Sequence, residues 1–201
     1  MFSLLTSIRR TWLYRKTWPY IYWLPTVYLI ADFFQLKTIN GRSMQPTLNP
    51  DSSRWKDTVL FSKYAIRVTH DYRRDDIVLL RSPEDPNHLL IKRIVALEGD
   101  TVQTLPPYPI REVVIPKGHV WVEGDEHFVS DDSNHFGPVS RGLIESKLLA
   151  IIWPPERFGP ADEVTRRDKK GMENEERRRK FRRSRVNISE VDQLSQPQPP
   201  N

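Results

Sequence analysis

The stretch LLIKRIVALEGD, residues 89–100, is an apolar run rich in β-branched residues that ends in a Gly-Asp turn signal. This combination favours a β-strand over a helix. Similar runs recur between residues 39 and 153: TVLF (58–61), DIVLL (76–80), EVVIP (112–116) and HVWVEGD (119–125). Gly, Pro, Asp and Asn bound these runs, and no long helical period appears before Gly142. Residues 39–158 are therefore expected to form a mainly β domain.

The chain before this domain has a basic start followed by an apolar segment. Residues 1–17 contain four basic residues and no acid, and residues 18–36 read WPYIYWLPTVYLIADFFQL. A helix of roughly 20 such residues can cross a bilayer, so we expect a transmembrane helix over 18–36 with the basic N-terminus on the positive-inside face. Pro19, Pro25 and Asp32 weaken the pattern, which leaves an amphipathic or targeting segment as the alternative.

The C-terminal segment, residues 159–201, is predicted to be a disordered charged tail. Twelve basic and six acidic residues lie between Arg157 and Arg185, and the chain ends in a Gln/Pro-rich stretch. Such a composition carries too little apolar surface to form a core, although a transient helix over 173–185 is possible. The tail is therefore expected to be dispensable for activity. LLAIIWPP, residues 148–155, is instead expected to close the domain.

The composition also limits the chemistry. The chain has no cysteine, which excludes disulfides, zinc-thiolate sites and thiol catalysis. The net charge of +5 belongs mostly to the tail, where acids are mixed in, so no nucleic-acid partner is expected. His127 and His135 lie in a loop without a ligand pattern, and we expect neither a metal nor a cofactor.

Two residues are candidates for nucleophilic chemistry. Ser43 lies in GRSMQPTLNP, residues 41–50, between Gly41 and Pro46. Lys92 lies inside an apolar strand, where burial would lower its pKa and allow the neutral amine to act as a base. Alone, Ser43 could be an ordinary turn serine and Lys92 an edge lysine. Arg93 should face the other side of the strand and is expected to be structural or to pair with a carboxylate.

A third stretch, residues 118–139 (GHVWVEGDEHFVSDDSNHFGPV), is dense in Asp, Ser, Asn and Gly. It is either a polar surface loop or a set of residues that orients the lysine. In the second interpretation, the Ser130 hydroxyl and the Asp132 carboxylate fix the position of Lys92.

SMQPTL, KRIVALEGD and SDDSNHFGPV, in this order after one apolar segment, together resemble the type I signal peptidase family, and within it the mitochondrial inner membrane proteases. The resemblance covers about residues 40–155. It implies an antiparallel β-domain at a membrane surface and a serine endopeptidase with Ser43 as nucleophile and Lys92 as general base. It implies no cofactor.

The resemblance carries further expectations about biology. It implies protein substrates that bear presequences and a sister catalytic subunit in a heterodimer. It also implies single-pass insertion in the mitochondrial inner membrane, with the catalytic domain facing the intermembrane space. A non-catalytic anchored subunit, or a basic-tailed binding protein that supports a sister protease, is the alternative.

The same resemblance assigns Gly41, Met44 and Pro46 to the substrate pocket and oxyanion region. Two positions depart from the family pattern. Bacterial members often have a serine at the position of Gly41, and its hydroxyl contributes to the oxyanion hole. Asp75 replaces the glycine of an R-G-D-I-V turn, which is acceptable if its backbone is left-handed.

Overall fold

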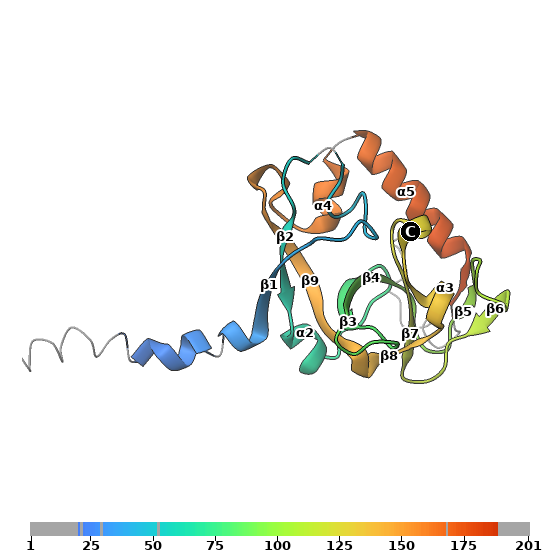
Figure 1. Ribbon diagram of the computed structural model, residues 1–201, viewed down its shortest axis with the longest axis horizontal. Coiled ribbons are helices and arrows are strands. Elements are labelled where there is room, and N and C mark those ends of the chain that lie inside the picture. The colour runs from blue at the N-terminus through green and yellow to red at the C-terminus, as the bar shows by residue number, and fades with distance from the viewer. Residues whose placement is uncertain (1–19, 21, 29, 52, 168, 189–201) are drawn as a thin grey trace, which may run out of the picture.

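The structure is a computed structural model that describes residues 20, 22–28, 30–51, 53–167 and 169–188 (Figure 1). The expected basic segment, residues 1–17, and the end of the chain from residue 189 lie outside the described residues.

Antiparallel strands build the domain, which confirms the mainly β expectation. The main sheet has seven strands in the order β1 (Phe34–Thr38), β2 (Thr58–Ser62), β9 (Ile144–Trp153), β3 (Ile77–Arg81), β4 (Leu89–Ala96), β7 (His119–Glu123) and β8 (Val139–Ser140). A smaller sheet has the order β10 (Val186–Asn187), β5 (Thr101–Gln103) and β6 (Glu112–Val114). Each of the five apolar runs predicted as strands contains a strand.

Short helices connect the strands or follow them. The α-helices are α2 (Tyr64–Arg67), α3 (Ser133–Phe136), α4 (Ala161–Arg166) and α5 (Lys169–Ser184), and the 3-10 turns are η1 (His127–Val129), η2 (Arg141–Leu143) and η3 (Pro155–Arg157).

The alternation of side chains along the strands divides the core into clusters. In β3, Ile77 and Leu79 belong to a cluster that also contains Met44, whereas Val78 and Leu80 belong to a second cluster. Since side chains in a strand point alternately to opposite faces, one strand supplies both clusters. β9 contains the LLAIIW run and pairs with β2 and β3, so this segment lies inside the main sheet, as a closing segment should.

The segment expected to cross a membrane differs from the prediction. Residues 20, 22–28 and 30–33 are helical and stand out from the domain, but Phe34–Leu36 already belong to β1, paired with β2 (Figure 1). Among the residues that the structure describes, no helix combines the length and the apolar character needed to span a bilayer. Residues 18, 19, 21 and 29 of the expected span lie outside the described residues.

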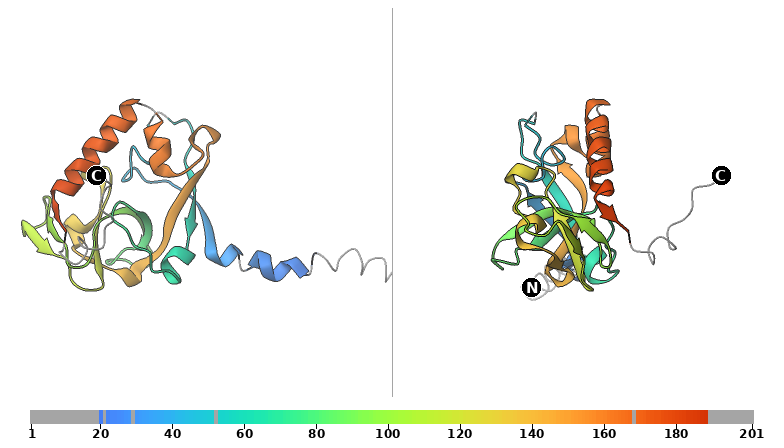
Figure 2. Two further views of the ribbon diagram at one scale, coloured as in Figure 1. Left: turned by 180° about the vertical axis from the view of Figure 1, so that it is seen from behind. Right: turned by 90° about the vertical axis from the view of Figure 1, so that its right-hand side faces the viewer.

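The prediction of a disordered tail from residue 159 is wrong for residues 161–167 and 169–187. Helix α5 lies along one side of the domain, and the chain then pairs with β5 (Figures 1 and 2). In α4, Ala161 and Val164 are buried in the first core cluster.

Buried ion pairs hold α5 to the domain. Arg182 contacts the carboxylates of Asp75 at 3.2 Å and Asp125 at 3.6 Å. Arg185 pairs with the buried Glu123. The acidic partners that stabilise this segment are therefore supplied by the β-domain, and composition alone could not show them.

This packing predicts that a chain ending at Gly159 is less stable than the full chain. The deletion removes Arg182 and Arg185 from buried carboxylates, and loss of one partner of a buried pair costs about 3–5 kcal/mol. Thermal or urea denaturation should show the difference, whereas a chain ending at Ile188 should match the full chain. Equal stability of the chain ending at Gly159 would contradict the structural role of α5.

Candidate active site

Lys92 is buried in the middle of the main sheet. Strand β4 lies between β3 and β7, so the lysine has no free sheet edge from which to reach water, and only 2% of its surface is exposed. Its Nζ donates a hydrogen bond to Ser130 Oγ at 3.0 Å. Burial lowers the pKa of Lys92, and the nearby carboxylates of Asp132 and Asp131 offset this effect in part. The environment therefore favours the neutral amine more than water does.

Ser43 lies in the loop between β1 and β2, and buried neighbours fix its place. Met44 and Leu48 are both buried in the first core cluster, and Leu48 N donates to Met44 O at 2.9 Å. The carbonyl of Ser43 accepts a hydrogen bond from Glu126 N at 3.0 Å. The nucleophile candidate is half-buried on a loop that is held on both sides.

Gly124 is the point where the Ser43 loop and the Ser130 segment meet. A β-carbon added at Gly124 would lie 2.2 Å from Ser130 Oγ and 2.6 Å from Ser43 O. Both distances are far below van der Waals contact, so only glycine permits this close approach. Lys92 joins the same group through its hydrogen bond to Ser130.

The Asp-Ser-Asn sequence at 132–134 positions Ser130 through backbone hydrogen bonds. Asp132 accepts from Gly124 N at 3.0 Å, Ser133 Oγ accepts from Val122 N at 3.0 Å, and Asn134 accepts from Leu105 N at 2.8 Å. Asp132 also caps α3. Ser130 therefore contacts the lysine directly, as expected, whereas Asp132 fixes the loop and influences Lys92 by its charge.

Arg93 points away from Lys92 and binds a carboxylate, which confirms the expectation. Its Nε and Nη2 donate to the two oxygens of Asp125 at 2.9 and 2.8 Å. Asp125 also accepts from Thr47 Oγ1 at 2.5 Å. Burial alone would raise the pKa of Asp125, but the charge and hydrogen bonds of Arg93, with help from Arg182 and Thr47, lower it to about 2. The pair ties β4 to the Ser43 loop.

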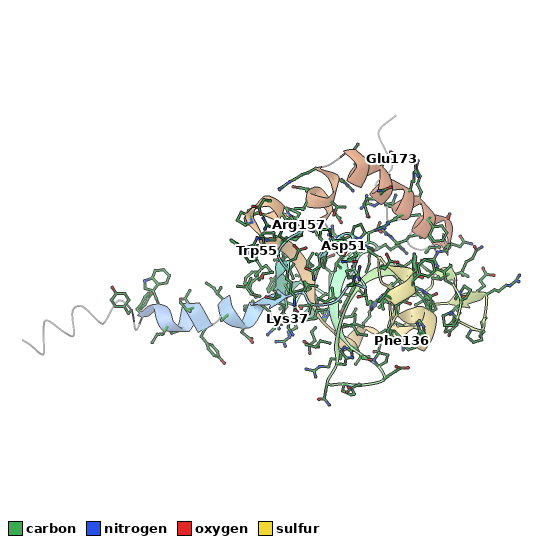
Figure 3. All side chains as sticks on the ribbon, turned by 45° about the horizontal axis from the view of Figure 1, so that its top comes forward. Lys37, Asp51, Trp55, Phe136, Arg157 and Glu173 are labelled. Carbon is green, nitrogen blue, oxygen red and sulfur yellow. The ribbon has the colours of Figure 1, made fainter. Side chains whose placement is uncertain are left out.

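A second clamp on the Ser43 loop comes from the segment after β9. Arg157, labelled in Figure 3, donates to Thr47 O at 2.8 Å and to both oxygens of Asp57 at 3.0 Å. Asp57 Oδ2 accepts in turn from Asn49 N at 2.8 Å. The closing segment of the domain thereby supports the nucleophile loop directly.

The remaining sequence candidates occupy different environments. Gly41 is exposed, and an added β-carbon would meet nothing within 4 Å, so the site has room for a larger residue there. Met44 is 2% exposed and packs in the core, while Pro46 is half-buried. Asp75 has φ 73°, which is the left-handed backbone that its replacement of glycine requires.

Neither His127 nor His135 takes part in the hydrogen bond between Lys92 and Ser130. His127 packs edge-on against Phe181 of α5, with ring centroids 6.3 Å apart, and His135 lies 4.0 Å from Asp131. Among the residues that the structure describes, no group of three or more His, Asp or Glu side chains could hold a metal ion.

The sequence did not predict a role at the site for four residues: Gly124, Thr47, Asp125 and Arg157. The glycine in VEGD was a usable signal, since a glycine between a strand and a polar loop often marks a close backbone approach. Arg157 gave no signal, because its partners lie about 100 residues earlier in the chain.

Comparison with known proteins gives consistent similarities. Residues 15–106 match the family model described as "Signal peptidase, peptidase S26". The chain is 46% identical over 142 residues to mitochondrial inner membrane protease subunit 2 of Schizosaccharomyces pombe, covering 70% of this chain and 77% of that protein. It is 42% identical to the subunit 2 of Saccharomyces cerevisiae (72% and 83% covered) and 48% identical to that of Mus musculus (63% and 71% covered). A signal peptidase I from Enterococcus faecalis aligns with a TM-score of 0.35 and 23% identity, over 39% of this chain and 97% of that one.

The geometry predicts that Gly124→Ala disrupts the site and that Gly41→Ala does not. The new methyl group at Gly124 would collide with Ser130 Oγ and with the Ser43 backbone, whereas the methyl group at Gly41 has open space. We expect Gly124→Ala to lower kcat/KM by about tenfold or more, since misplacing catalytic groups by about 1 Å is already costly. Presequence cleavage by the two purified variants is the measurement. Equal activity would rule out Gly124 as the point of contact.

Proposed function

Because the chain belongs to the signal peptidase family, peptidase S26, we propose that it is a serine endopeptidase of the mitochondrial inner membrane that removes sorting presequences from proteins delivered to the intermembrane space. The observation that carries the proposal is a lysine 2% exposed and hydrogen-bonded to Ser130, at the place where the Ser43 loop approaches. A lysine base requires a desolvated amine of this kind.

We assign Ser43 as the nucleophile and Lys92 as the general base. The neutral amine of Lys92 takes the hydroxyl proton of Ser43 while Ser43 attacks the scissile carbonyl. Lys92 then protonates the leaving amine and later activates the water that releases the acyl-enzyme. Ser130 accepts one N–H of Lys92 and so limits the directions in which the amine can point. Backbone N–H groups stabilise the oxyanion, a contribution of about 3–4 kcal/mol per donor in other enzymes.

The substrate is proposed to bind as an extended segment beside the active-site strand, with a small residue before the scissile bond in a shallow apolar pocket. Gly41, Met44 and Pro46 are assigned to the pocket and oxyanion region because they surround Ser43 in the chain. Since Gly41 lacks a hydroxyl, backbone donors carry more of the oxyanion stabilisation here than in members with serine at that position.

The domain limits are proposed from the same evidence. We assign residues 34–158 to the peptidase domain, because β1 belongs to its main sheet, and residues 161–167 and 169–187 to a mostly helical extension packed on it. The part of the expected span that precedes β1, residues 18–33, is assigned as a single-pass anchor, with the basic residues 1–17 in the matrix and the catalytic domain in the intermembrane space. When only the outer mitochondrial membrane is opened, added protease should digest the catalytic domain. A domain that stays protected under these conditions would refute this orientation.

The partner is proposed to be a sister catalytic subunit, because the relatives are named as subunits of a protease. Affinity isolation from detergent-solubilised membranes should recover a second signal-peptidase-like chain. An active monomer would contradict this. The alternative role of a non-catalytic subunit is disfavoured because Ser43 and Lys92 are both present, Lys92 donates to Ser130, and the Ser43 backbone approaches Ser130 at Gly124.

Two substitutions test the catalytic assignment. Ser43→Ala and Lys92→Arg should each lower presequence cleavage by at least about a thousandfold, since guanidinium cannot lose a proton at usable pH and removal of a nucleophile is of this order elsewhere. Lys147→Arg is the matched control. Val78 of β3 pairs with Lys92 of β4 on one side and with Lys147 of β9 on the other. Lys147 forms ion pairs with Asp71 and Asp76, which an arginine at this position can keep. Substantial cleavage by folded Lys92→Arg would exclude Lys92 as the base.

A further inference from the structure

Three consecutive residues at the end of β7 and just after it, Glu123, Gly124 and Asp125, connect the C-terminal extension to the candidate active site. The two carboxylates are buried, and each contacts an arginine of the extension. Arg185 forms an ion pair with Glu123, and Arg182 Nη1 lies 3.6 Å from Asp125 Oδ1. The extension therefore holds this segment on both sides of Gly124.

The catalytic groups lie against Gly124, at the place where a side chain would be. An added β-carbon would lie 2.2 Å from Ser130 Oγ and 2.6 Å from Ser43 O, and Gly124 N donates to Asp132 at 3.0 Å. Ser130 Oγ in turn accepts from Lys92 Nζ at 3.0 Å. Since neighbouring side chains of an extended segment point to opposite sides, the arginines contact one side of these three residues and the catalytic groups contact the other.

Glu123 depends on Arg185 more than on its other partners. Its Oε1 accepts from Trp121 Nε1 at 2.9 Å and from Asn134 Nδ2 at 3.2 Å, and both donors are neutral. Within the described part of the chain, Arg185 is the cation that pairs with Glu123. Its loss would leave a buried carboxylate without a compensating charge, which is costly and favours a shift of the segment toward water. Asn134 Nδ2 also donates to Asp132 at 3.1 Å, so such a shift would reach the loop that contacts the lysine.

Arg185 is itself held in place. Gln103 N donates to Arg185 O at 2.8 Å, and Arg185 Nη1 donates to Gln103 O at 3.1 Å. The next two residues form β10, which pairs with β5 in the smaller sheet (Figure 1). The guanidinium therefore projects from backbone that is fixed by a sheet.

Arg182 is less critical for its carboxylate. Asp125 already has a bidentate contact with Arg93 and accepts from Thr47 Oγ1, so it stays paired when Arg182 is removed. The two arginines of the extension should therefore differ in effect, with Arg185 the more important for the site.

We propose that Arg185 is a positioning residue of the protease, which acts through Glu123 on the segment that places Ser130 and the Lys92 amine. The proposal rests on the proposed function, with Ser43 as nucleophile and Lys92 as base. It gives the C-terminal extension a part in catalysis, although the sequence predicts a tail that is dispensable for activity.

The test uses the full-length protein in its detergent-solubilised complex and a presequence peptide that the Ser43→Ala complex does not cleave. The kcat and the KM are measured separately, at a temperature well below the unfolding midpoint of each variant, so that lost stability does not contribute. Arg185→Gln should lower kcat by about tenfold, since a small misplacement of catalytic groups is costly. The KM should change by less than about twofold, because the loss falls on the transition state and not on substrate binding.

Further variants identify the interaction responsible. Arg185→Gln combined with Glu123→Gln should recover most of the kcat, because replacing both partners of a buried pair costs far less than removing one. Arg177→Gln removes the same charge from an exposed position on α5 whose ion pair, with Glu173, stays within the helix, so its kcat should match the wild type. Arg182→Gln should give a kcat between those of Arg185→Gln and the wild type.

Several results would overturn the proposal. Wild-type kcat in folded Arg185→Gln would leave Arg185 a purely structural residue. An equal loss of kcat in Arg177→Gln would assign the effect to the charge of the helix as a whole. A folded double variant that recovers none of the lost kcat would exclude the ion pair with Glu123 as the link.

Arg185→Lys decides the question if Arg185→Gln does not fold. Lysine keeps the charge but cannot contact Glu123 and Gln103 with one planar group, so kcat should fall by about threefold, and an unchanged kcat would overturn the proposal. The proposed function fails separately, if the Ser43→Ala complex cleaves every peptide that the wild type cleaves.

Discussion

The site depends on the buried ion pair between Arg93 and Asp125. Burying two charges is costly unless the geometry and the remaining hydrogen bonds are nearly complete. Here the contact is bidentate, and Asp125 also accepts from Thr47 on the nucleophile loop. Arg93 follows Lys92 in the chain and faces the opposite way, so the pair fixes the strand that carries the proposed base. One interaction thus sets β4 against the Ser43 loop, while α5 reaches the same carboxylate through Arg182.

The lysine and the arginine show how one strand serves two purposes. Arg93 has a carboxylate in contact and keeps its charge, because the attraction exceeds the cost of burial. Lys92 has a serine hydroxyl in contact, while the carboxylates that act on it do so through space. Burial lowers the pKa of both adjacent cations, but the net shift is upward for Arg93 and downward for Lys92. The difference between a structural residue and a base lies in the partner and not in the degree of burial.

Sequence reasoning succeeded where local pattern decides structure. The five apolar runs were found as strands, and the contact of Lys92 with Ser130 was anticipated. It failed for α5, because low hydrophobicity was taken to mean disorder. Arg182 of that helix and Arg185 just after it are ordered by Asp75, Glu123 and Asp125, which lie 57 or more residues earlier in the chain. Gly124 was missed for the same reason, since its neighbours come from two other segments.

Catalysis by Ser43 requires that Lys92 is neutral when the enzyme works. The most direct measurement is the titration of the Lys92 amine by NMR, with the side chain isotopically labelled, alongside the pH dependence of kcat/KM. We predict that the pKa of Lys92 lies below the ordinary lysine value of 10.5 and that activity rises with pH through the same pKa. A Lys92 amine that titrates at its ordinary value, while cleavage is already complete at neutral pH, would contradict the account.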